Sequence, residues 1–101
     1  MKLLFVTCIR EDQPVTATIF EKAGIRVFSV MEAIGHKTGL QEELIDSWFA
    51  SGAERFDSVV LFSFTEPKIA DSVMQLIRAA NNESASNFPI RAFLMPVEQT
   101  V

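Results

Sequence analysis

The residues best suited to chemistry in this 101-residue chain stand in one stretch, Gly35 to Arg55, which holds the only histidine and the only tryptophan. The stretch opens with the sequence GHKTG. Two glycines that flank a basic pair let a backbone approach a ligand closely, and Lys37 beside His36 can meet an anion. The order of glycine and lysine differs from that of the phosphate-binding GxxxxGK(S/T) loop. Taken alone, the pattern is better explained as a strand exit followed by a helix start.

The rest of this stretch has the pattern of a short amphipathic helix. Thr38 followed by Gln41 is a capping-box pattern, and the apolar residues recur at helical spacing: Leu40, Leu44, Ile45, Trp48 and Phe49. The opposite side is acidic, which disfavours an anionic membrane surface. An apolar helix face can dock into a groove of a protein partner. The alternative is packing on its own domain or on a neighbouring subunit, and the residues leave both open.

His36 is also a candidate metal ligand, although one histidine and one cysteine cannot form a protein-only zinc site within a single chain. A metal site would need His36 from several subunits, meeting on a symmetry axis. Catalysis has no positive support. Cys8 lies in an apolar run, where cysteine usually acts as a small apolar residue, and no serine or carboxylate pair has a catalytic context. We therefore expect that the protein is not an enzyme.

Composition narrows the class of protein further. The net charge is −4, and the nine lysines and arginines are scattered, so we expect no nucleic-acid partner. No run approaches the roughly 20 apolar residues that span a bilayer, so we expect no membrane insertion. The sequence MKLLFVTCIR is followed at once by acidic residues, and we interpret it as a first strand rather than a signal peptide. A single cysteine fits a reducing compartment, and we expect a cytoplasmic protein of one domain, residues 1–101.

The remaining chain predicts four strands and two helices. Apolar runs predict strands over Leu3 to Ile9, Ile25 to Ile34, Ser58 to Phe64 and Pro89 to Val97. The first helix has Asp12 as N-cap, Pro14 in its first turn and Gly24 at its end, with Val15, Ile19, Phe20 and Ala23 as its apolar stripe. The second has Thr65 as N-cap and Pro67 in its first turn, with Ile69, Val73, Leu76, Ile77 and Ala80 as its stripe. A polar turn is expected over Asn81 to Asn87.

The order of these elements, β-α-β, insertion, β-α-β, predicts an α+β fold of the ferredoxin-like βαββαβ type. We expect a four-stranded antiparallel sheet with both helices on one face and a long insertion, 35–55, between the second and third strands. The third strand is the most apolar and is expected near the centre of the sheet. The prolines at both ends of the fourth strand favour an edge position.

A sheet covered on one face should alternate apolar and polar residues, and these strands do not. Both sides are apolar in three of them: Leu3, Phe5 and Ile9 against Leu4, Val6 and Cys8; Val59 and Leu61 against Val60, Phe62 and Phe64; Phe93 and Met95 against Leu94. An open face of this composition would exceed the apolar patch that a monomer usually exposes. We favour self-association that covers the second face. The alternative is that the insertion folds back over the sheet.

The pair Ile9-Arg10 and the sequence AGIRVFSVMEAIGHKTG resemble PII-like signalling proteins, the family of the nitrogen regulatory proteins. The order of elements agrees over nearly the whole chain. The resemblance implies a homotrimer of ferredoxin-like subunits, with adenine nucleotides bound in clefts between them. It also implies that 35–55 stands where the family has its T-loop, the loop that docks onto transporters, enzymes or regulators.

The resemblance implies a ligand site at Arg10, Gly35, His36, Lys37 and Arg91, and a partner-binding loop that carries the apolar residues of 40–49. The chain departs from the family in two places. It has NNESASNFP where the family has a Gly- and Lys-rich phosphate loop, and it has no tyrosine. We therefore interpret it as a divergent branch, similar to accessory proteins of cation or metal efflux systems. CutA-type cation-tolerance proteins share the trimer but lack the long loop, so a protein that binds divalent metal through His36 is the alternative.

Overall fold

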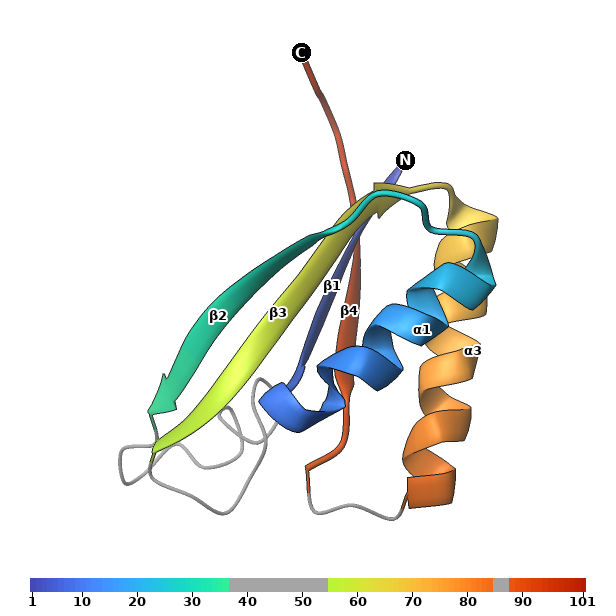
Figure 1. Ribbon diagram of the computed structural model, residues 1–101. Coiled ribbons are helices and arrows are strands. Elements are labelled where there is room, and N and C mark those ends of the chain that lie inside the picture. The colour runs from blue at the N-terminus through green and yellow to red at the C-terminus, as the bar shows by residue number, and fades with distance from the viewer. Residues whose placement is uncertain (37–54, 85–87) are drawn as a thin grey trace.

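The chain folds into a single sheet with two α-helices packed against it (Figure 1). The computed structural model describes residues 1–36, 55–84 and 88–101, and for residues 55 and 56 it describes the backbone alone. The elements are β1 (Lys2–Ile9), a 3-10 turn η1 (Arg10–Asp12), α1 (Gln13–Ala23), β2 (Ser29–His36), β3 (Arg55–Thr65), α3 (Pro67–Ser84) and β4 (Arg91–Pro96).

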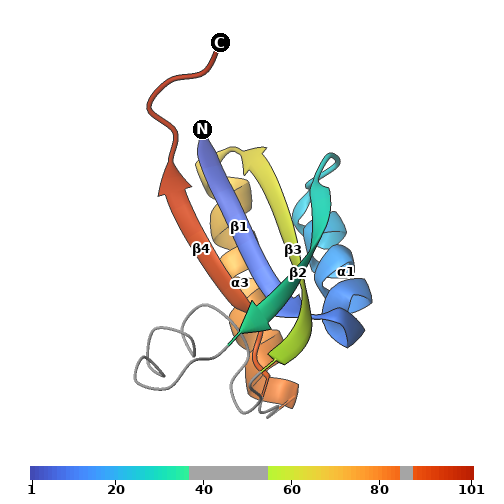
Figure 2. The same ribbon diagram turned by 90° about the vertical axis from the view of Figure 1, so that its left-hand side faces the viewer.

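The sheet has the order β2-β3-β1-β4, and every neighbouring pair of strands is antiparallel. Both helices cover the same face, and the other face, called the open face below because neither helix covers it, is turned toward the viewer in Figure 2. This arrangement confirms the predicted ferredoxin-like α+β fold, with β3 inside the sheet and β4 at an edge. Within the described ranges, none of the helices has the length and apolar character needed to cross a bilayer.

The register assigns every strand residue to one of the two faces. Val6 pairs with Leu61 on β3 and with Ala92 on β4, and all three face the helices. Because side chains alternate along a strand, the residues between them face the open side. The open face therefore carries Leu3, Phe5, Thr7 and Ile9 of β1, Ser58, Val60, Phe62 and Phe64 of β3, Ser29, Met31 and Ala33 of β2, and Arg91, Phe93 and Met95 of β4.

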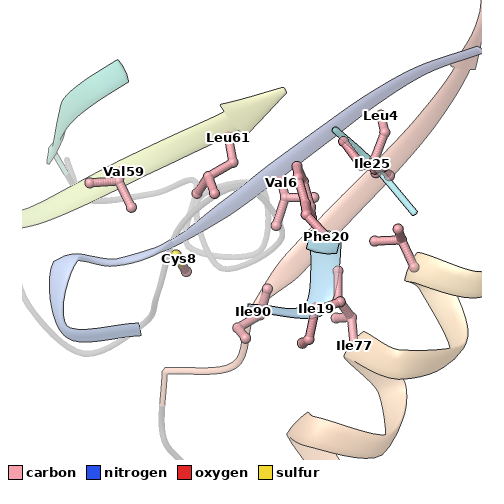
Figure 3. Close-up of a cluster of buried hydrophobic side chains, with 11 residues drawn as sticks. Leu4, Val6, Cys8, Ile19, Phe20, Ile25, Val59, Leu61, Ile77 and Ile90 are labelled. Atoms are coloured by element: carbon pink, nitrogen blue, oxygen red, sulfur yellow. The ribbon is translucent and has the colours of Figure 1, made fainter. Parts of the chain in front are cut away.

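The core lies between the sheet and the helices (Figure 3). Leu4 and Val6 at its centre have no exposed surface, and neither do Leu61 of β3 and Phe20 of α1. The α1 helix ends at Gly24 as predicted. The φ angle of Gly24 is +97°, a left-handed conformation that glycine adopts without a steric penalty. The Gly24 N–H donates to the Glu21 carbonyl at 3.1 Å, which completes the last turn.

Several predicted boundaries differ from the structure. β2 continues through His36 and β3 begins at Arg55, so the predicted insertion 35–55 is shortened to 37–54. Two further differences have a visible cause. β2 begins at Ser29 rather than Ile25, because the Ile25 N–H donates to the Phe20 carbonyl at 2.9 Å and its side chain is buried in the core. The α3 helix continues through Ser84, so it includes the first part of the turn expected over 81–87. Asn81 explains this extension. Its amide donates to the Ile90 carbonyl at 2.9 Å and its Oδ1 accepts the Ile90 N–H at 2.9 Å, which holds the end of α3 beside β4.

The buried side of α1 differs from the predicted stripe at one turn. Val15 is 48% exposed, whereas Thr16 has no exposed surface. The Thr16 hydroxyl donates to the Asp12 carbonyl one turn back at 3.0 Å, so its polar group is satisfied inside the core. Asp12 precedes the helix, but its side chain makes no capping hydrogen bond.

Two valines on the helices provide a matched test of this core. Val73 of α3 is fully buried, whereas Val15 of α1 is 48% exposed. We expect Val73→Ala to lower the free energy of unfolding by about 2 kcal/mol, because it removes two buried carbons and leaves a cavity. Val15→Ala should change it by no more than about 0.5 kcal/mol. Urea denaturation followed by circular dichroism measures both, and equal losses would contradict this packing.

Candidate functional site

The predicted ligand residues that the structure describes all lie at one end of the sheet. Arg10 follows β1, Gly35 and His36 close β2, and Arg91 opens β4 opposite Thr7 of β1. This is the end from which segment 37–54 connects β2 to β3, opposite the two chain termini in Figure 1. The other candidates, Lys37 and the apolar residues Leu40, Leu44, Ile45, Trp48 and Phe49, lie outside the described residues.

The guanidinium of Arg10 already forms an ion pair with a carboxylate of the same chain. Its Nη1 donates to Oε1 of Glu32 at 2.7 Å, between the residue that follows β1 and the middle of β2. This hydrogen bond raises the pKa of the Arg10 guanidinium and lowers the pKa of the Glu32 carboxyl. The carboxylates of Asp57 and Glu11 also act on Arg10. Both partners of the pair are exposed, at 48% and 72%, so an incoming anion would compete with Glu32 for an accessible guanidinium.

Arg91 lies apart from the other candidates. It stands on the edge strand β4, whereas Gly35 and His36 belong to β2 at the opposite edge. The strands β3 and β1 lie between them, a lateral separation of about 14 Å at about 4.8 Å per strand. The faces differ as well, because Arg91 stands on the open face and Glu32, the partner of Arg10, pairs with the helix-facing Val59. One copy of the chain therefore does not unite the predicted ligand set.

Gly35 and His36 extend β2 beyond the end of β1. Gly35 pairs with Phe56 and is buried, while His36 pairs with Arg55 and is exposed. An exposed imidazole at the end of a strand is accessible to a second molecule. In the described part of the chain, no three His, Cys, Asp or Glu side chains are grouped to hold a metal ion. His36 remains a single candidate ligand that would require other copies.

Cys8 belongs to the core, as its apolar neighbours predict. It is 4% exposed, and its sulfur lies 3.5 Å from the Thr16 hydroxyl. Burial raises the pKa of the thiol, and the nearby Asp12 carboxylate raises it further, against the opposing effect of the Thr16 hydrogen bond. A buried thiol held in its protonated form is a poor nucleophile.

The face of the sheet that carries no helix has several exposed apolar side chains. Phe64 is 56% exposed and Met95 is 40% exposed, and Met31 of β2 is 46% exposed. An open depression of about 550 Å³ lies along β1 and β4, lined by Leu3, Phe5, Ala92, Phe93, Leu94 and Met95. An uncovered surface of this kind marks an interaction site more often than a free surface.

Two residues of this region were not among the sequence candidates. Glu32 was assigned to a strand, but its contact with Arg10 links positions 22 residues apart. Ser58 is 1% exposed on the open face, and its hydroxyl is paired with no acceptor in the described chain. The alternation of β3 could have placed Ser58 on the face opposite Val59. The sequence could not show that the Ser58 hydroxyl has no acceptor, because the neighbours of Ser58 follow from the register of the whole sheet.

The fold is similar to that of a solved structure from Thermus thermophilus that bears the name "putative PII-like signaling protein". The two agree with a TM-score of 0.66 at 11% sequence identity, over 95% of this chain and 85% of the other. No protein-family model matches the sequence, and no curated protein matches it. At this level of identity the similarity establishes the fold, and it agrees with the fold that the sequence predicts.

The Arg10–Glu32 pair gives a pH-dependent prediction. Because the folded pKa of Glu32 is lowered, the pair stabilises the folded chain at neutral pH and is lost as the pH falls through that lowered pKa. We expect the Glu32 carboxyl carbon, followed by NMR, to titrate below the ordinary glutamate range. Arg10→Gln should return it to that range, while Arg26→Gln, at an exposed position on the connection before β2, should leave it unchanged. Identical titration curves in all three proteins would exclude the pair in solution.

Proposed function

We propose that the protein is a homotrimeric PII-like regulator that binds a protein partner through the segment between β2 and β3. The observation that carries the proposal is the position of that segment. It leaves the sheet and returns to it at the end where Arg10, His36 and Arg91 lie. A ligand bound at this end can therefore bias a segment that a partner recognises. The similarity in fold to a protein named as PII-like signalling supports this assignment.

Self-association is the first part of the proposal. The helices cover one face of the sheet, and the open face exposes Phe64, Met31 and Met95. Burial of such surface gives about 25 cal/mol per Å², so a second copy with the same apolar face is a suitable cover. Three copies would follow the arrangement that the family resemblance implies.

The second part is a small ligand bound between copies. Arg91 is separated from Gly35 and His36 by two intervening strands, so a site that uses all three needs the β2 edge of one copy beside the β4 edge of another. An adenine nucleotide is the ligand that the resemblance suggests. The Gly- and Lys-rich phosphate loop of the family has no counterpart in NNESASNFP. Phosphate contacts would therefore fall to Arg10, Lys37 and Arg91.

The third part is the partner. The apolar side of the predicted helix within 37–54 consists of Leu40, Leu44, Ile45, Trp48 and Phe49, which would enter a groove of the partner. A membrane transporter is our candidate partner, and the regulator itself is proposed to be cytoplasmic and without enzymatic activity. An accessory role in cation or metal efflux fits the same scheme. A protein that binds divalent metal through His36 of several copies is the competing assignment.

Light scattering after gel filtration tests the assembly. We expect a mass near three times 11.3 kDa at micromolar concentration. Phe64→Glu should dissociate the assembly, because it places a charge on the apolar open face, where Phe64 is 56% exposed. Val27→Glu is the matched control, since Val27 is 81% exposed on the connection between α1 and β2. A monomeric wild-type protein would contradict the trimer.

Affinity capture tests the partner-binding segment. Wild-type protein, Trp48→Ala, Leu44→Ser and the control Glu43→Gln are immobilised, and bound membrane and soluble proteins are identified by mass spectrometry. We expect one protein to be recovered with the wild type and the control and to be at least about ten-fold depleted with the two apolar variants, since such anchors carry most of the binding energy. Equal recovery on all four columns would remove this segment from the partner interface.

A further inference from the structure

The strand β2 forms an edge of the sheet without the features that usually protect one. Within the described residues it pairs with β3 alone. Its eight residues, Ser29–His36, include no lysine and no proline, which are residues that edge strands commonly carry against pairing with another chain. Its one carboxylate, Glu32, is paired with Arg10 of the same chain. The edge of β2 is therefore a template on which a further strand can add.

Both faces of β2 are accessible as well. Met31 is exposed on the open face, and Val30 and Ile34 on the helix side are 41% and 48% exposed. A chain that adds to β2 would bury apolar side chains on both faces, in addition to forming backbone hydrogen bonds. An added strand therefore gains more here than on an edge whose faces are already covered.

The opposite edge, formed by β4, is shorter. It has six residues, and the N–H of Val97, which follows it, donates to the Met1 carbonyl directly before β1 at 3.3 Å. In an antiparallel ladder, residues whose backbone groups face one neighbour alternate with residues that face the other side. The even-numbered residues of β4 therefore face the free edge, and among them Pro96 has no N–H. Ala92 and Leu94 are the remaining donors of β4 on that edge.

Residues 97–101, which follow β4, leave the sheet without a partner strand (Figures 1 and 2). Residues 98–101 are exposed, and within the described chain the Val97 N–H makes the only backbone hydrogen bond of this segment. Val97, Thr100 and Val101 are β-branched, a type that is enriched in strands. The segment therefore has the composition of a strand and lacks a neighbour.

The register determines how β4 of one copy can meet β2 of another. Because each neighbouring pair of strands is antiparallel, β2 and β4 run in opposite directions. A head-to-tail contact would therefore place them as an antiparallel pair, with the open faces of both copies on the same side. Arg91 at the start of β4 is level with Met31 of β2, and β2 and β4 extend from this level toward opposite ends of the sheet.

A ladder along all of β2 therefore needs a neighbouring copy that is displaced along the strand direction. β4 supplies six of the eight residues required. The missing residues cannot precede β4, because the N–H and the carbonyl of Ile90 are both bonded to the Asn81 side chain at 2.9 Å. They must follow Pro96, and this is the position of residues 97–101.

We propose that residues 97–101 of one copy extend β4 into a longer strand that pairs antiparallel with β2 of the next copy. The N–H groups of Glu98 and Thr100 donate to carbonyls of β2, because even-numbered residues face the free edge of β4. The inference rests on the self-association in the proposed function. It adds the segment through which the copies join, which is neither the open face nor segment 37–54.

Truncation tests the segment. A variant that ends at Val97 lacks residues 98–101 and keeps the hydrogen bond to Met1. Light scattering over a dilution series gives the protein concentration at which half of the assembly dissociates. We expect this concentration to rise at least about ten-fold, because two backbone hydrogen bonds between copies are lost. The circular dichroism spectrum should stay that of the wild type, since the deleted residues are exposed.

Proline substitutions test the pairing itself, because only alternate residues face β2. Glu98→Pro removes an N–H that donates to the next copy, and we expect the dissociation concentration to rise about three- to ten-fold. Gln99→Pro is the matched control, since the Gln99 N–H faces away from β2, and its effect should stay within about two-fold. Glu98→Gln removes the charge alone and should behave like the wild type.

Amide hydrogen exchange identifies the strand that receives the segment. In the assembled wild type we expect protection along the whole of β2, both where its amides face β3 and where they face the next copy. In the variant that ends at Val97, alternate amides of β2 should exchange at least about ten-fold faster, because they lose their acceptors. The amides of β2 that are bonded to β3 serve as the internal reference.

Three results would overturn the proposal. The first is an unchanged dissociation concentration of the truncated variant. The second is an equal effect of Glu98→Pro and Gln99→Pro. The third is unchanged exchange in β2 after truncation, which would mean that this edge is unpaired or has another occupant, such as β2 of a second copy or a strand of a foreign protein. A monomeric wild type would end the proposed trimer as well, whereas a trimer that persists undiminished after truncation would end this inference alone.

Discussion

The pairing of β1 with β3 is the interaction on which the rest of the molecule depends. These two strands form the centre of the sheet, and both have apolar side chains on both faces. On one face, Val6 and Leu61 lie beneath the helices without exposed surface. On the other face, Leu3 and Phe64 have no helix over them. Burial on the first face stabilises the sheet, and the second face is the one that the proposed self-association would cover.

Much of the fold could be predicted because its signals are local. Gly24 marks the end of α1 through its own backbone conformation, and Pro67 opens α3. The start of β2 could not be predicted. Ile25 is apolar and fits a strand pattern, but its N–H donates to the Phe20 carbonyl, so this residue belongs to the end of α1. The burial of Thr16 likewise depends on a hydrogen bond to Asp12, which a pattern of apolar residues does not contain.

The candidate site could be predicted only as a set of residue types. A sequence indicates that Arg10 and Arg91 are basic, but their surroundings follow from the register of the sheet. The register places Glu32 where it neutralises Arg10, and it leaves Arg91 on the apolar face without a carboxylate. Two arginines of equal chemistry thus acquire different roles. Arg10 is paired with a carboxylate, whereas Arg91 forms no ion pair within the described residues.

The separation of these groups limits the symmetry of any assembly that unites them. Gly35 and His36 lie on the β2 edge and Arg91 on the β4 edge of the same sheet. A two-fold axis that joins the sheets edge to edge places β2 beside β2 or β4 beside β4, whereas a two-fold axis parallel to the strands of two stacked sheets places the β2 edge of one copy over the β4 edge of the other. Head-to-tail contact places the β2 edge of one copy beside the β4 edge of the next, and such contacts close into a ring when the rotation permits. A site that needs both edges can therefore form either in a face-to-face two-fold pair or in a ring, and the trimer proposed above is an assembly of the second kind.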